Sequence, residues 1–411
     1  MSAMIRKRFV IAAVATLAIA ITGLGLGAGT AYARSDAAAF EATLSTKDRK
    51  AFNAYLTAKT FHDADKDAFW AKVSTKRKKR RAKIRKGALV TERDYVTAFP
   101  PEFEGPELSK ALASKWKAWQ TRDADKGPAR KRSTLPGVKD FLRNAKRYYG
   151  FLPERIPERE FKRRYAAEAL RLGLSQEQVV RVYALETGGN GTADMQAGIH
   201  PISKKGRPIS SALGYAQLLN ANSTSELAKH GNNFLKRLER MRDQADNEAR
   251  RARLDRKITS LRKMVRKAKS IPFNWGRHRK FARTGPGLGI HALNLDGDIG
   301  PWLQVIKLKG IKELAERKGR DDLDSTELEL MNLAGPSTGL EMMSAIGLSM
   351  PTVNFFARRG YERNSVVRGR TSTELLAELK KRMDYNERNS GAKEFVQVFK
   401  ELNAKQKRAQ R

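Results

Sequence analysis

The 411-residue sequence contains no cysteine, which excludes disulfide bonds, thiolate metal sites and a cysteine nucleophile. Histidine is scarce, and no two of the five histidines have the i, i+4 spacing that places two metal ligands on one face of a helix. We therefore expect no metal and no other cofactor. Period-two alternation of apolar and polar residues is almost absent as well, so the sequence predicts a mainly α-helical fold.

Acidic residues are few compared with basic ones, 44 against 82, and the formal net charge is +38 with a pI near 10.5. Such a charge favours polyanionic partners, namely nucleic acid, acidic lipid or an anionic cell-wall polymer. Hydrophobic residues still make up 40% of the chain, so it can bury a core beneath a densely charged surface.

The N-terminus narrows the choice of polyanion. Arg6-Lys7-Arg8 precede an apolar stretch over residues 9–29, and Ala31-Tyr32-Ala33 offers the small residues that a signal peptidase reads. We predict a signal peptide over residues 1–33 with cleavage after Ala33. The alternative is an uncleaved anchor, because the 21 uncharged residues could just span a bilayer.

Both alternatives place the body of the protein outside the cytoplasm, in the periplasm or in the secreted or cell-wall fraction. The expected partners are then peptidoglycan glycan strands and other anionic cell-envelope polymers. Nucleic acid is not expected, although charge alone would also fit an exported nucleic-acid binder. A membrane is expected as a partner only through the N-terminal segment, if that segment stays uncleaved.

Composition and breaks in the helical pattern divide the mature chain into three regions. Residues 34–136 are predicted to form a basic helical N-terminal region with linkers. Residues 137–345 are predicted to form a helical domain that carries a long helical insertion at 239–270. Residues 346–411 are predicted to form a C-terminal helical extension.

Two features of the first region have alternative interpretations. Nine of the eleven residues 76–86 are basic, which indicates either a docking surface for an anionic polymer or a solvated helix without a particular partner. Trp116 and Trp119 fit a short helix, where they either stack on sugars or pack against the next domain.

One helix of the second region ends on a carboxylate. Ser175-Gln176-Glu177-Gln178 forms a capping box that predicts the start of this helix. The residues that follow give it an almost wholly apolar surface, which is typical of a helix at the centre of its domain. The helix is predicted as far as Glu186, because Gly188-Gly189 break the helical pattern.

The segment after this helix is rich in Gly, Asn, Ser and Pro, and residues 187–211 are predicted to form a long loop. We expect the next helix over residues 212–219, where it would carry Tyr215 and Gln217. Further on, Asp296-Gly297-Asp298 match the start of a calcium loop, but the following acidic ligands are missing. No metal site is therefore predicted there.

Two of these stretches, residues 184–190 (ALETGGN) and 212–218 (ALGYAQL), resemble motifs of the soluble lytic transglycosylase domain. In that family a helix ends in Glu-Ser-Gly and a later segment carries Gly-Leu-Met-Gln. The resemblance covers roughly residues 160–345. It implies a lysozyme-like helical fold related to goose-type lysozyme and cleavage of peptidoglycan glycan strands.

The resemblance also implies roles for single residues. Glu186 matches the catalytic acid/base, and Thr187 matches the serine beside it. Gly214 and Gln217 match the two ends of the second motif, with Tyr215 and its neighbour in place of Leu-Met.

The third motif of the family, Ala-Tyr-Asn followed by Ala-Gly-Pro, has two rival matches, Ala292-Leu293-Asn294 and residues 332–336 (NLAGP). Neither match supplies the tyrosine that lies near the catalytic carboxyl in the family. The substrate-binding residues expected from the resemblance are Gln217, Tyr215, Thr187, Gly214 and Asn294.

The chemistry expected of this site depends on one carboxylate. Glycosidases usually need two, and Asp194 is only a weak second candidate, with which hydrolysis would replace transglycosylation. A single carboxyl fits substrate assistance: Glu186 protonates the glycosidic oxygen, and the acetamido group of the sugar stabilises the anomeric centre. Glu186 then accepts a proton from the C6 hydroxyl, which closes a 1,6-anhydro ring.

This role requires a protonated Glu186 near neutral pH. Desolvation on an apolar helix would raise its pKa, whereas the many nearby cations would lower it. The bland interpretation is that Glu186 is a helix-end carboxylate bound to backbone N–H groups or to Arg181. A catalytically silent lysozyme-fold protein that binds the cell envelope is therefore the alternative to an enzyme.

Overall fold

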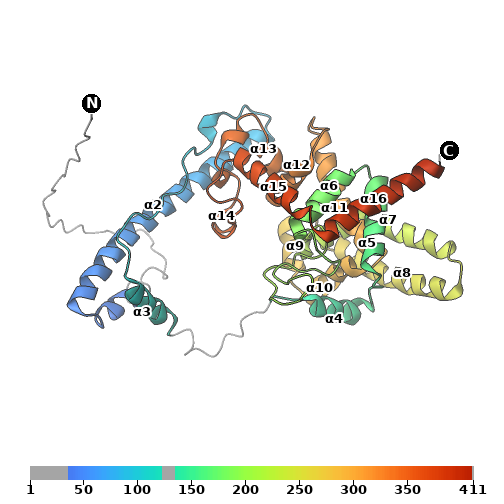
Figure 1. Cartoon of the computed structure of the whole chain (residues 1–411), viewed down its shortest axis with the longest axis horizontal. Coiled ribbons are helices and arrows are strands. Elements are labelled where there is room, and N and C mark those ends of the chain that lie inside the picture. The colour runs from blue at the N-terminus through green and yellow to red at the C-terminus, as the bar shows by residue number, and fades with distance from the viewer. Residues whose placement is uncertain (1–35, 123–134, 410–411) are drawn as a thin grey trace. The chain divides into compact units, whose positions relative to one another are not determined.

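The computed structural model describes residues 36–122 and 135–409 (Figure 1). Regular structure among these residues is helical apart from isolated β-bridges, so the predicted mainly α-helical fold is confirmed. The predicted signal segment, its cleavage site after Ala33 and most of the linker at 126–136 lie outside the described residues. Within the described ranges, no helix combines the length and the apolar composition needed to cross a bilayer.

The chain forms two compact units. The smaller unit comprises residues up to 64 and residues 102–130, and the larger unit comprises residues 65–101 and 131–411. Helix α2 (Thr46–Arg85) contributes residues to both units, because the first division falls inside it. The smaller unit also contains α3 (Lys110–Thr121). Its core is built on Phe40 and Phe52, and the Trp116 ring lies 4.8 Å from the Phe40 ring, centroid to centroid. Trp116 and Trp119 thus pack within their own unit.

Residues 36–41 of the smaller unit are helical as well. The other helices of the described residues belong to the larger unit. In chain order they are the 3-10 helix η1 (Glu92–Asp94), α4 (Val138–Tyr149), α5 (Glu158–Arg171), α6 (Gln176–Thr187), α7 (Asn220–Asp243), α8 (Glu248–Lys269), α9 (Trp275–Phe281), α10 (Gly285–His291), η2 (Ala292–Leu295), α11 (Ile299–Glu316), α12 (Ser325–Ala334), α13 (Pro336–Met342), η3 (Gly347–Ser349), η4 (Thr352–Asn354), α14 (Arg358–Arg363), α15 (Ser372–Asn386) and α16 (Ser390–Ala409). Two hydrophobic clusters form its core.

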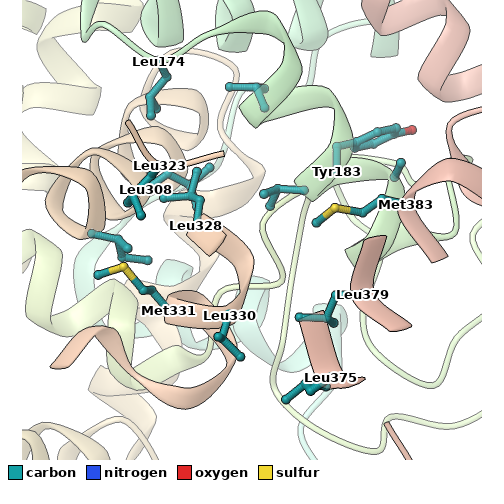
Figure 2. Packing of buried hydrophobic residues seen from close by; sticks show 14 of the residues in the cluster. Leu174, Tyr183, Leu308, Leu323, Leu328, Leu330, Met331, Leu375, Leu379 and Met383 are labelled. Carbon is teal, nitrogen blue, oxygen red and sulfur yellow. The ribbon is translucent and has the colours of Figure 1, made fainter. Parts of the chain in front are cut away.

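The first cluster joins α6, α11, α12 and α15 (Figure 2). Tyr183 of α6 and Met383 of α15 lie on one side of the view, and Leu308 of α11 and Leu328 of α12 lie on the other. The second cluster is formed by α4, α7, α8, α10 and the start of α11. Helix α11 therefore contributes to both clusters and connects the two halves of the unit.

Residues 239–270, expected as a helical insertion, form the end of α7 and all of α8, and the two helices pack side by side (Figure 1). Apolar residues of α8 recur at spacings of three and four, and two of them, Leu254 and Leu261, are fully buried. Beside them, the buried Nζ of Lys257 lies 3.1 Å from an Asp296 carboxylate oxygen and also contacts Asp298. The two aspartates of the loop are therefore ion-pair partners of the α7–α8 hairpin.

The basic run 76–86 lies at the end of α2, and the structure divides it. Arg77 donates hydrogen bonds to the carbonyls of Val353 and Asn354 at 2.6 and 2.8 Å. Arg80 is fully buried and bonds the same Asn354 carbonyl at 2.8 Å. Other members of the run, Lys78 among them, are exposed. Neither sequence interpretation was complete, because part of the run anchors α2 within the larger unit.

Candidate active site

Helix α6 begins and ends where the sequence predicts. The Ser175 hydroxyl accepts a hydrogen bond from the Gln178 N–H at 3.0 Å, and the Gln178 side chain accepts one from the Ser175 N–H at 3.1 Å. Gly188 has a φ of 64°, a left-handed conformation that ends the helix at almost no cost for glycine. Glu186 thus lies in the last turn of a helix whose other side is buried.

The Glu186 carboxyl meets side chains from two other helices. Asn332 of α12 donates a hydrogen bond to Glu186 Oε1 at 2.9 Å and lies 3.1 Å from Glu329 Oε2. Lys307 of α11 donates to the Asn332 side-chain oxygen. These four residues, Glu186, Lys307, Glu329 and Asn332, are called the Glu186 cluster below. Lys307, Glu329 and Asn332 lie next in the chain to Leu308, Leu328 and Met331 of Figure 2, which belong to the first core cluster.

Burial controls the protonation of the Glu186 cluster. It raises the pKa of Glu186 to about 7, although Lys307 and hydrogen bonds to Glu329 and Asn332 act in the opposite direction. Burial and the charge of Glu186 raise the pKa of Glu329 well above its usual range. Ionisation of Glu186 therefore keeps Glu329 protonated, because two adjacent carboxyl groups cannot both ionise at low cost. Desolvation therefore outweighs the neighbouring cation at this site.

Lys307 responds in the opposite sense. Burial lowers its pKa, and the charges of Glu186 and Glu329 oppose that effect. A cation near two carboxyl groups limits the energetic cost of the one that ionises.

The position of Glu329 restricts what it can do. In retaining glycosidases the two carboxyl groups lie about 5 Å apart, and in inverting ones about 6.5–9.5 Å, because substrate or water must fit between them. Glu329 instead accepts a hydrogen bond from the same Asn332 amide nitrogen as Glu186, and it is only 3% exposed. A side chain this buried is poorly placed to act from the opposite face of a sugar, and Glu186 is the acidic residue of the cluster that is partly exposed.

A tyrosine near the carboxyl comes from helix α5. Tyr165 is buried, and its pKa is raised first by that burial and then by the negative charge of Glu186. Neither rival match to the third motif contains a tyrosine, so sequence comparison alone did not identify this residue.

Residues 212–219 do not form the expected helix. Leu213 and Leu218 exchange two backbone hydrogen bonds, each of 3.0 Å, and the residues between them form a turn. Gly214 and Gln217 have φ values of 78° and 39°, which lie outside the right-handed helical region. The prediction of a helix here was wrong because two of its residues take left-handed conformations.

Gln217 is partly exposed within this turn. Its amide nitrogen donates to the carbonyls of Gly214 at 2.7 Å and Met195 at 3.2 Å. Gly214 lies against Gln304, since a Cβ on it would come within 2.5 Å of that side chain. Among the hydrogen bonds and ion pairs of the described residues, none joins Gln217 to Glu186.

Tyr215 points into the core. It is 1% exposed, and its hydroxyl donates to a carboxylate oxygen of Glu158. Its ring packs 5.5 Å from that of Tyr165 and 4.9 Å from that of Tyr183, centroid to centroid. Tyr215 therefore supports the tyrosine that lies near Glu186.

The other expected site residues lie apart from the carboxyl. Thr187 is buried and donates to the Tyr183 carbonyl at 2.6 Å. Asn294 is fully buried and donates to the Ser223 hydroxyl at 2.8 Å. Of the two rival matches to the third motif, only the one that contains Asn332 contacts Glu186.

Asp194 is an ionised surface carboxylate. Burial opposes its ionisation, but hydrogen bonds from Thr192, Lys204 and Arg155 lower its pKa to about 2. Lys204 and Arg155 each approach it to 3.0 Å. A carboxylate that binds two cations is a poor proton acceptor at neutral pH.

The turn after Glu186 is held by Asn389, just before α16, and by the first turn of α16. The carbonyl of Gly189 accepts a hydrogen bond from the Ala392 N–H at 2.8 Å, and Asn389 donates to the Gly188 carbonyl at 2.9 Å. A Cβ on Gly189 would lie 2.1 Å from the Asn386 carbonyl oxygen, so only glycine fits there. We call residues 389–392 the C-terminal clasp.

Three members of the Glu186 cluster were not selected as site residues from the sequence. Asn332 belongs to the rival match for the third motif, and Glu329 lies three residues before it, on the same helix face. Lys307 is a single cation within the apolar first half of α11. The sequence offered one signal for these residues, namely that the carboxylate of Glu329 and the amide of Asn332 lie one helical turn apart, just before Ala-Gly-Pro.

Comparisons of the chain with protein-family models, curated proteins and solved structures find no match. The residues of the chain are therefore the whole basis for its functional assignment.

Proposed function

We propose that this protein is an exported lytic transglycosylase that cleaves the bond between N-acetylmuramic acid and N-acetylglucosamine in peptidoglycan. One observation carries the proposal. Glu186 is a partly exposed residue at a helix end, and burial of its carboxyl raises the pKa to about 7. Such a group is protonated in a large fraction of molecules at neutral pH, as a general acid must be.

In the proposed reaction, Glu186 donates its proton to the glycosidic oxygen as that bond breaks. The acetamido oxygen of the muramic acid residue stabilises the positive charge at the anomeric carbon. Glu186, now ionised, accepts the proton of the C6 hydroxyl, whose oxygen bonds to the anomeric carbon. The products are two shorter glycan strands, one of which ends in a 1,6-anhydro ring, and the Glu186 carboxyl has regained its proton.

The rest of the Glu186 cluster supports this cycle. Burial and the charge of Glu186 keep Glu329 protonated, and its hydrogen bond lowers the pKa of Glu186, so Glu329 favours the carboxylate that forms after proton transfer. Asn332, at 2.9 Å, orients the carboxyl through its amide. Lys307 stabilises the transient carboxylate after proton transfer.

The absence of a second accessible carboxyl in the cluster favours transglycosylation over hydrolysis. Hydrolysis needs a base or nucleophile on the opposite face of the sugar, and Glu329 is buried beside Glu186. The strong positive charge of the chain would keep the enzyme close to anionic envelope polymers.

The second candidate is a catalytically silent protein of the same fold that binds the envelope. It is favoured by the completeness of the Glu186 cluster, in which Asn332, Glu329 and Lys307 already supply partners for Glu186. A buried polar network of this kind can also serve only to specify the fold.

Digestion of purified sacculi separates the two candidates. The wild-type chain should release anhydro-muropeptides, and Glu186→Gln should abolish the release while keeping its circular dichroism spectrum. Glu313→Gln, which changes an exposed carboxylate on α11, is the matched control and should keep activity. Binding to sacculi without release by the wild type would establish the silent protein, and ordinary reducing ends would identify a hydrolase.

A further inference from the structure

A strongly basic surface lies at the end of α8, on the connection to α9 and on α9 itself. Residues 262–283 include nine Lys and Arg residues and no acidic residue. All nine are exposed: Arg262, Lys263, Arg266, Lys267, Lys269, Arg277, Arg279, Lys280 and Arg283. Of these, only Arg262 belongs to an ion pair within the described part of the chain, at 3.0 Å from Glu239. We call residues 262–283 the α8–α9 surface.

Two large aromatic side chains stand out among these cations. Phe273 is 63% exposed and Trp275 is 49% exposed. The connection that carries them is ordered by Asn274, whose side chain caps α9 by accepting a hydrogen bond from the Arg277 N–H at 3.3 Å. The Phe273 ring lies 5.2 Å from the ring of the buried His278, centroid to centroid. The protein thus holds apolar groups in solvent at a fixed position, which is typical of an interaction surface.

The end of α4 extends the same chemistry. Tyr148 is 43% exposed and lies against Gly285, since a Cβ on that glycine would come within 2.4 Å of the tyrosine ring. Its neighbours Lys146 and Arg147 are exposed as well. Gly285 follows closely after Arg283, so aromatic and basic side chains continue from α9 to α4.

We propose that the α8–α9 surface docks the protein onto a bilayer that contains anionic phospholipid. Phe273 and Trp275 would enter the boundary between headgroups and acyl chains, where aromatic side chains are favoured. The surrounding Lys and Arg side chains would contact lipid phosphates, each contributing attraction to the negatively charged surface. The N-terminal segment is not needed for this contact, in contrast to the expectation from the sequence.

The pairing of aromatic and basic groups favours a bilayer over a dissolved polyanion. Cations alone suffice to bind an anionic polymer, because such binding follows from charge neutralisation. Phe273 has no polar atom for hydrogen bonding to a sugar or phosphate, but its exposed ring gains free energy on entering an apolar phase. The α8–α9 surface shares no residue with the Glu186 cluster, so its test is independent of glycan cleavage.

The test is sedimentation of the full chain with phosphatidylcholine vesicles that contain or lack phosphatidylglycerol. Binding should require the anionic lipid and weaken by about fivefold for each of Arg277, Arg279 and Lys280 changed to Gln. Phe273→Ala and Trp275→Ala should each weaken binding by about tenfold, through loss of apolar contact. Tyr385→Ala, which removes a 71% exposed aromatic from α15, is the matched control and should bind as the wild type.

A second readout reports on Trp275 itself. The N-terminal apolar stretch is identical in all variants, so differences in sedimentation between variants cannot arise from it. If this stretch itself binds vesicles, however, it masks the effect of the substitutions. Quenching of tryptophan emission by lipids with a spin label near the headgroup avoids this problem. The quenching should be present in the wild type and lost in Trp275→Phe. Three results would each overturn the proposal. The first is unchanged quenching in Trp275→Phe, and the second is that the wild type does not bind vesicles. The third is that the protein binds dextran sulfate while neither aromatic variant weakens its binding to vesicles.

Discussion

Replacing Glu186 by glutamine should stabilise the protein at pH 8 and change its stability little at pH 4.5. Burial raises the pKa of Glu186 from its ordinary value of 4.5 to about 7. In the unfolded chain the carboxyl ionises near 4.5, whereas the folded protein holds its proton up to about pH 7. Stability associated with this proton is therefore present at low pH and lost as the pH rises through 7.

The magnitude follows from the two pKa values. The loss amounts to about 3 kcal/mol of unfolding free energy between pH 4.5 and pH 8. Glutamine does not titrate, so the variant escapes this loss and the difference between the two proteins should grow from near zero to about 3 kcal/mol. Urea unfolding followed by circular dichroism at both pH values measures it.

The control for this measurement is Glu313→Gln, which changes an exposed carboxylate on α11. Its unfolding free energy should follow that of the wild type within about 0.5 kcal/mol at both pH values. A gain in Glu186→Gln that is the same at pH 4.5 and pH 8 would refute the reasoning, because it could not come from ionisation of a buried carboxyl. This experiment does not depend on any enzymatic activity.

Three further variants test contacts around the site. Lys257→Met leaves buried aspartates without their cation and should lower the unfolding free energy, measured by urea titration, by about 3 kcal/mol or more. Its control is Lys263→Met, which changes an exposed residue of the same helix and should alter the unfolding free energy by less than about 0.5 kcal/mol. Gly214→Ala places a Cβ against Gln304 at a positive φ and should lower the melting temperature by several degrees, about 1–3 kcal/mol; an unchanged melting temperature would contradict the turn described. Asn389→Ala removes the hydrogen bond to the turn after Glu186 and should cost about 1 kcal/mol, with faster amide exchange in that turn by mass spectrometry; equal exchange in both proteins would show that the clasp is not needed.

Local signals explain what the sequence could predict. The start and end of α6 are encoded within the helix and its flanks, by Ser175 and Gln178 at one end and Gly188 at the other. The position of Glu186 in the last turn could therefore be read directly. The mainly helical fold followed from the lack of period-two patterns in the same way.

The partners of Glu186 could not be read from the sequence, because they depend on how distant helices pack. Asn332 lies 146 positions after Glu186 in the chain. Nothing in the residues around Asn332 says whether it or Asn294 approaches the carboxyl. Single-sequence reasoning therefore left two matches open, and only the packing of α12 on α6 distinguishes them.

The prediction for residues 212–219 was wrong and the interpretations of residues 76–86 were incomplete, for different reasons. A short apolar run fits a helix or a turn equally well by pattern, and the left-handed conformation of Gln217 has no sequence signature comparable to glycine. In the basic run, charge alone suggested solvent exposure. The carbonyl of Asn354, which binds both Arg77 and Arg80, comes from a segment more than 270 positions away.

The C-terminal clasp has a consequence for biosynthesis. Asn389 and Gly188 are joined across 201 positions of the chain, and synthesis proceeds from the N-terminus. A nascent protein therefore exposes Glu186 long before residues 389–392 have been added. The candidate site stays unfinished in every nascent chain that lacks these residues, so the clasp delays maturation of the site until they have been made.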